Sequence, residues 1–384
     1  MSNSSRAELN SDDGSEIDAK TPTAEDIADV ERERDSIREF VAGLNFVDIK
    51  NGNWFPRLLA TSLTSYAEKV DAKYFQDKYQ GVPPDAIVDQ RIKMAARYAA
   101  IEGGLSASAY TATVAATIGT VGGSSPATVP MGIATVMVDI AYLSQLQLKL
   151  AYDIAVLYGV PLDVDDPEDL WKLIRVAFTV KSGEFVREGV NKAVPALMRP
   201  LIKRFYSGAV LNAARGLPVV GKFLLQRNLI KIGIPVVGIP LAVVLNRGTT
   251  VVAGKHAQSV FRNEARVLEV AKRLMDRSRH PQLLLWVAWL VINADGRISD
   301  DEALLIRHLI RFARERHEIA DERLTSVVDL DPDDVWLLLS ETDGEISDVL
   351  DASVVIAEID GGINSKERKV IDELSGRSSG RQAT

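Results

Sequence analysis

The chain has 384 residues, of which 46% are hydrophobic and 26% charged, so it is long enough for two or three domains with apolar cores. It contains no cysteine, which excludes disulfides and thiolate chemistry and is typical of a reducing compartment. The net charge of −8 conceals a strong separation of acidic and basic residues along the chain.

The N-terminal residues 1–22 are polar and acidic and lack the basic start and apolar run of a signal peptide, so we expect a disordered tail on a cytoplasmic protein. Thr23 and Asp26 are spaced as a helix N-cap and its partner. Apolar residues then recur at helical spacing, at Ile27, Val30, Ile37, Val41 and Leu44. Pro83-Pro84 predicts a break before another helix, which should reach Ala99.

The stretch from Gly103 to Val138 contains no charged residue and is rich in Gly, Ala, Ser and Thr. Its piece Gly104 to Val121 is close to the shortest membrane-spanning length of about 17 residues. Because Pro126 and Pro130 divide the stretch, we expect a hairpin that is buried or lies on a membrane, with a transmembrane helix as the alternative.

The segment from Met131 to Tyr158 is apolar almost all round at helical spacing, which predicts a helix in the interior of a bundle. Asp166 followed by Pro167 is typical of a helix start. We therefore interpret the acids at 163, 165 and 166 as a helix cap in preference to a metal site.

No carboxylate occurs between Glu188 and Glu264, whereas eleven basic residues do. This sorting of charge predicts an anionic partner surface for the middle of the chain, with a solvated basic face as the alternative. The stretch lacks aromatic interleaving and any nucleic-acid-reading module, so nucleic acid is not expected. Gly-Pro steps should interrupt its helices at Pro218, Pro235 and Pro240. The cations that we assign to the anionic surface are Lys203, Arg204, Arg215, Lys222, Arg227, Lys231, Arg247 and Lys255.

Two apolar segments share features with a known family. Residues 139–159 read D-I-A-Y-L-S-Q-L-Q-L-K-L-A-Y-D-I-A-V-L-Y-G, and residues 234–246 read I-P-V-V-G-I-P-L-A-V-V-L-N. Together they resemble the EcsC family. The resemblance covers roughly residues 85–265 of a predicted domain 23–279. It implies an all-α helical bundle with Gly/Pro-rich apolar hairpins. Because the family's name comes from an operon that also encodes an ABC transporter, it also implies proximity to a membrane.

His280-Pro281 predicts a boundary before a second domain, residues 280–375, which is followed by a disordered tail, residues 376–384. The motif D-G-x-I-x-x-x-E occurs twice in this domain, at Asp295 to Glu302 and at Asp360 to Glu367. The repeat resembles the tellurite-resistance TerB family. The resemblance implies a smaller all-helical bundle with internal pseudo-symmetry, and acidic loops that have been proposed to bind divalent metal.

Each copy of the motif has a simple structural interpretation. Asp-Gly forms a turn, Ile298 or Ile363 points into the core, and Ser299 or Asn364 caps the next helix in a capping box with the Glu three residues later. The alternative is a composite site for Ca²⁺ or another divalent cation. Its ligands would be Asp295, Glu302, Asp360 and Glu367. A conventional EF-hand is not expected, because Val291 and Ile356 stand where its first ligand belongs.

Catalytic signatures are weak. Gly216 to Lys222 resembles a Walker A loop, but Phe223 stands where Mg²⁺ binding needs Ser or Thr. The four histidines are too scattered for a zinc motif, and His308 shares an apolar helix face, which predicts a core or interface residue. No Ser/His/Asp or paired-acid arrangement stands out, so we expect no enzyme and no cofactor beyond the divalent cation.

Two functional hypotheses follow. The first is a non-catalytic, membrane-peripheral adaptor in a bacterial stress response to envelope, metal, tellurite or phage stress. Its first domain would bind an anionic membrane surface or a membrane protein, and its TerB-like domain would bind protein partners. The alternative is an enzyme or transporter regulator whose site lies in the EcsC-like core, at polar residues such as Asp139, Gln145 and Gln147.

Overall fold

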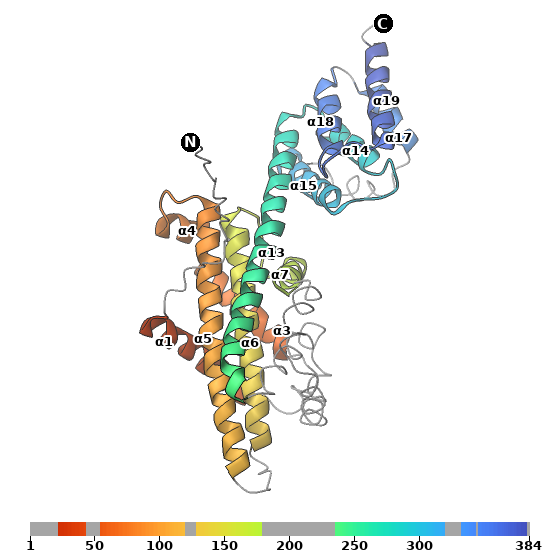
Figure 1. Ribbon diagram of the computed structural model, residues 1–384. Helices are drawn as coiled ribbons and strands as arrows, with labels where there is room; N and C mark the ends of the chain where they lie inside the picture. The colour runs from red at the N-terminus through yellow and green to blue at the C-terminus, as the bar shows by residue number, and fades with distance from the viewer. Residues whose placement is uncertain are drawn as a thin grey trace, which may run out of the picture. The chain divides into compact units, whose positions relative to one another are not determined.

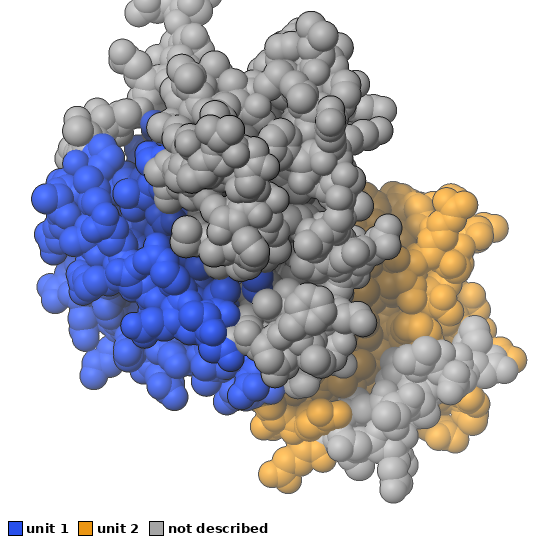
Figure 2. All heavy atoms as spheres, turned by 90° about the horizontal axis from the view of Figure 1, so that it is seen from below, with its two compact units in different colours: residues 1–157, 162–258 blue, residues 158–161, 259–384 orange. Residues whose placement is uncertain are grey.

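The computed structural model describes residues 22–43, 54–119, 128–178, 235–318, 332–342 and 345–381. Every regular element in these ranges is an α-helix and none is a strand, which confirms the all-α class (Figure 1). The chain divides into two compact units, residues 1–157 with 162–258 and residues 158–161 with 259–384, which are coloured separately in Figure 2.

Helix α1, Ala24–Ala42, begins as predicted: the Thr23 hydroxyl accepts from the Asp26 amide, and the Asp26 carboxylate accepts from the Thr23 amide. Its buried apolar stripe contains Val30, Ile37 and Val41, whereas Ile27 is 37% exposed. The helices α3, Trp54–Ala67, and α4, Ala72–Lys78, follow, and all three pack against α6. These short helices therefore cover one long central helix.

Two long helices of the first unit, α5, Pro84–Gly119, and α6, Thr128–Leu157, pack together and lie side by side in Figure 1. The predicted helix 131–158 corresponds to α6. The helix that was expected to reach Ala99 continues to Gly119, because no proline interrupts the small residues that follow. The uncharged stretch 103–138 is thus divided between the end of α5 and the start of α6. Helix α7, Pro167–Phe178, begins at the predicted proline and packs on α6.

The 43-residue helix α13, Pro235–Arg277, runs antiparallel to α5 and parallel to α6. A Cβ on Gly103 would lie 2.8 Å from the carbonyl oxygen of Ala242, and a Cβ on Gly254 would lie 2.7 Å from the side chain of Ile92. Glycine at these two positions lets the helices approach closely. The predicted interruption at Pro240 does not occur, because α13 continues through this residue to Arg277.

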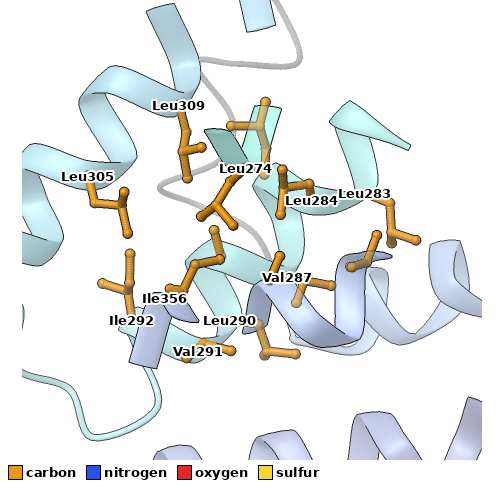
Figure 3. Packing of buried hydrophobic residues seen from close by; sticks show 14 of the residues in the cluster. Leu274, Leu283, Leu284, Val287, Leu290, Val291, Ile292, Leu305, Leu309 and Ile356 are labelled. Atoms are coloured by element: carbon orange, nitrogen blue, oxygen red, sulfur yellow. The ribbon is translucent and has the colours of Figure 1, made fainter. Parts of the chain in front are cut away.

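The second unit is organised around α14, Pro281–Ile292, which is apolar on nearly every side and packs against four helices. These are α15, Asp300–His317; α17, Pro332–Glu341; α18, Ser347–Ala357; and α19, Ser365–Arg381. Figure 3 shows Leu284 and Val287 of α14 among Leu305 and Leu309 of α15 and Ile356 of α18. A helix without a polar face requires such complete enclosure.

The main segment of the second unit begins at Ser259, just past the middle of α13, whereas the sequence placed the boundary at residue 280. The chain does leave the helix before His280, as the His-Pro step predicts. However, Val267, Ala271 and Leu274 of α13 are buried in the core of the second unit. The change of domain therefore occurs inside a continuous helix, where no turn residue marks it.

Candidate functional site

The uncharged segments of α5, α6 and α13 meet at one end of the first unit. Residues 103–119, 128–138 and 235–246 contain no charged side chain. The first two segments lie at the end of α5 and the start of α6, which pack together (Figure 1), and Gly103 packs against Ala242 of the third. At this end Val244 of α13 is 64% exposed. Within the described ranges, no helix combines the length and the apolarity needed to cross a membrane.

Buried polar side chains mark the level at which this charge-free end begins. Asn246 Nδ2 of α13 donates to Glu102 Oε2 of α5 over 2.8 Å, and both residues are fully buried. Asp139, the first charged residue of α6 after the uncharged stretch, is 2% exposed. The charged body of the unit and its charge-free end are therefore separated by a buried polar layer.

The polar residues of the alternative core site lie on α6 and are all buried. Gln147 Nε2 approaches Thr250 Oγ1 of α13 at 3.4 Å. Gln145 is 5% exposed and faces a pocket between α1, α3 and α6. The structure thus places Gln145 and Gln147 on different sides of α6, toward different neighbours.

Of the cations assigned to the anionic surface, two lie within the described residues. Lys255 is half exposed, and its Nζ forms an ion pair of 2.7 Å with Asp89 of α5. Arg247, which follows the uncharged segment of α13, is half-buried. The remaining six lie outside the described residues, as does the Walker-like segment 216–223. These are Lys203, Arg204, Arg215, Lys222, Arg227 and Lys231.

Both D-G-x-I-x-x-x-E motifs of the second unit form the predicted turn and capping box. Gly296 and Gly361 have φ of 72° and 114°. The Ser299 amide donates to Glu302 over 2.6 Å, and the Asn364 amide donates to Glu367 over 2.8 Å. The stabilising role of each Glu is thereby confirmed, and each cap contributes on the order of 1 kcal/mol.

The two copies differ at their isoleucines. Ile363 packs against the core as predicted, but Ile298 is 45% exposed. The prediction that both point inward was therefore wrong for Ile298, and the internal symmetry of the unit is only approximate. His308 of α15 is 4% exposed and lies 3.9 Å from the Glu264 carboxylate, which confirms its predicted place in the core.

The fold brings the two motif loops together. Asn364 Nδ2 donates to Glu367 Oε1 over 2.5 Å and approaches Asp295 Oδ2 at 3.4 Å. The pKa of Glu367 is raised, first by burial and then by the negative charges of Glu302, Asp360 and Asp295, although the Asn364 amide opposes the shift. All four predicted acids therefore share one neighbourhood. In the described ranges no three His, Asp or Glu side chains already form a cluster able to hold a metal ion.

Comparison with known proteins finds no family model, no curated protein and no solved structure that matches the chain.

One buried polar network was not predicted from the sequence. Arg91 of α5 pairs with the fully buried Asp153 of α6, with Nε donating over 2.8 Å. The Tyr66 hydroxyl of α3 donates to the same carboxylate over 2.8 Å and accepts from Arg91 over 2.9 Å. A lone aspartate in the apolar segment 150–157 was the signal that could have revealed it, because a buried carboxylate needs a partner.

Proposed function

We propose that the protein is a non-catalytic, EcsC-like adaptor that attaches peripherally to an anionic membrane by the charge-free end of its first unit. The observation that carries the proposal is the convergence of three uncharged helical segments at one end, where Val244 is exposed. Uncharged, apolar helix ends can enter the headgroup region without the desolvation of a charge. The TerB-like second unit would recruit protein partners in a bacterial stress response, at the cytoplasmic face of the membrane.

The acid-free segment 189–263 supports an anionic lipid as the partner. Each well-placed Lys or Arg contributes about 1 kcal/mol to binding at such a surface. With no carboxylate in this segment, repulsion from the lipid would be weakest there.

Vesicle co-sedimentation tests the proposal. The full chain should bind vesicles of phosphatidylglycerol and phosphatidylethanolamine, bind phosphatidylcholine vesicles weakly, and lose binding as salt is raised. Lys203→Gln combined with Arg204→Gln should weaken the partition coefficient by roughly 30-fold, from about 1 kcal/mol per cation. Lys255→Gln is the matched control, because Asp89 already pairs with this lysine. Absence of binding to every vesicle type would refute the proposal.

A second role, response to a divalent cation, is favoured by the approach of the two motif loops, where Asn364 Nδ2 lies 3.4 Å from Asp295 Oδ2. The pKa of Glu367 is raised there, first by burial and then by the repulsion of Glu302, Asp360 and Asp295. A cation between the motif loops would relieve this repulsion, with Asp295, Glu302, Asp360 and Glu367 as its candidate ligands. Calorimetric titration of the full chain with Ca²⁺, Mg²⁺ and Zn²⁺ tests it. Binding that is lost in Asp295→Asn would support the role. No heat at millimolar ion would leave the capping boxes as the whole function of these acids.

A further inference from the structure

A pocket of about 430 Å³ lies between α1, α3 and α6 of the first unit. This volume lies within the range of small-molecule sites in proteins. Its walls combine the apolar side chains of Ile37 and Leu58 with four hydroxyl groups. The hydroxyls belong to Ser36, Thr61, Ser62 and Ser65. The pocket lies on the charged body of the unit, so it is separate from the proposed membrane-facing end.

Gln145 distinguishes this pocket from an ordinary groove between helices. The side chain is only 5% exposed, and it lines the pocket. Gln147, two residues further on the same helix, is equally buried but reaches Thr250. A glutamine amide carries both donors and an acceptor. Because Gln145 lines the pocket, its amide can offer both kinds of hydrogen bond to a ligand there.

The charged residues around the pocket favour an anion. Lys69 and Lys149 line it against a single acid, Glu33, which forms an ion pair with Lys149. The ring of Tyr66 also lines the pocket. Its hydroxyl cannot donate to a ligand, because it already donates to Asp153 and accepts from Arg91. Lys149 also lies over the Tyr66 ring, 5.6 Å from its centroid. Hydroxyls, one amide and an excess of positive charge therefore face the cavity.

We propose that this pocket binds a small organic anion that carries a neutral donor–acceptor group, such as a carboxamide. The neutral group pairs with the Gln145 amide, and the carboxylate or phosphate lies toward Lys149 and Lys69. Gln145 and Lys149 are four residues apart on α6, so they are neighbours on one helix face, about 6 Å apart at Cβ. A few carbon atoms between the two groups of the ligand are enough to span them.

Saturation-transfer NMR on the full chain tests this assignment with three probes. Glutaramate carries both groups, pentanamide carries the amide alone, and pentanoate carries the carboxylate alone. Probes of this size bind in the millimolar range at best. Glutaramate should bind most tightly and should compete with each of the other two.

Gln145→Leu should weaken glutaramate binding by at least about tenfold, as expected for the loss of a hydrogen bond to a buried partner. In this variant the affinity for glutaramate should be no higher than the affinity for pentanoate. Thermal melting should show that the variant folds, since leucine can fill most of the space of the glutamine side chain. Gln90→Leu, on an exposed position of α5, is the matched control and should bind as the parent does. Two results would overturn the proposal. One is the absence of saturation transfer to every probe at about 10 mM, a concentration above the weakest Kd expected for such fragments. The other is equal binding of glutaramate by the parent and by Gln145→Leu.

Discussion

Asn246 of α13 donates a 2.8 Å hydrogen bond to Glu102 of α5, and both side chains are fully buried. Glu102 is the last charged residue before the uncharged stretch 103–138, and Asn246 is the last residue of the uncharged stretch 232–246. The bond therefore joins the two helices at the level where both lose their charged side chains. It fixes the register that brings their charge-free segments to the same end.

Replacement of either partner should destabilise the first unit. A hydrogen bond to a charged group contributes about 1.5–3 kcal/mol, so Asn246→Leu should lower the free energy of unfolding by roughly 2 kcal/mol. In a double-mutant cycle with Glu102→Leu, measured by urea denaturation, the two effects should be non-additive by about 1 kcal/mol or more. Strict additivity would show that the two side chains do not interact.

Adjacent glycines on α5 should respond in opposite directions to alanine. A Cβ on Gly103 would lie 2.8 Å from the Ala242 carbonyl oxygen, so Gly103→Ala should cost about 1–3 kcal/mol. On Gly104 the nearest atom would be 3.7 Å away, on Val243, so Gly104→Ala should stabilise by up to about 1 kcal/mol through helix propensity. Thermal melting measures both. If Gly103→Ala were also stabilising, α5 and α13 would not be in close contact.

Glu367→Gln should remove part of the pH dependence of the second unit. The pKa of Glu367 is raised in the folded state, so that state holds its proton to higher pH than the unfolded chain does. Stability is therefore lost as pH rises from the ordinary glutamate pKa through the raised one. Gln still accepts from the Asn364 amide but carries no charge, so the variant should be the more stable at pH 7.

Melting temperatures between pH 4 and 8 measure this effect. Glu269→Gln, at an exposed position of α13, is the matched control and should keep the pH dependence of the parent. An unchanged slope in Glu367→Gln would mean that the pKa of this carboxyl group is not raised in the folded state.

The sequence predicted local structure well wherever the signal was local. The caps at Thr23, Ser299 and Asn364 depend on residues three positions apart, and the structure confirms each of them. The uncharged stretches were also visible in the sequence. Their convergence was not, because it depends on the packing of Gly103 against Ala242, about 140 positions away along the chain.

The unpredicted features share this dependence on distant partners. The network of Tyr66, Arg91 and Asp153 joins three helices, and no spacing rule relates its members. The pocket at Gln145 likewise needs α1 and α3 to be placed against α6. The resemblance to the EcsC and TerB families remains a prediction, which rests on the motifs alone.

Vesicle binding by Val244→Asp tests most directly whether the charge-free end meets the lipid. Val244 is 64% exposed, so the aspartate should leave the fold intact while placing a charge at this end. Binding to anionic vesicles should fall at least tenfold, since an inserted carboxylate would be desolvated and repelled. Val82→Asp is the control, because Val82 is also exposed but lies just before the first residue of α5, at the other end of that helix. This variant should bind vesicles like the parent. Equal binding by both variants would contradict the account.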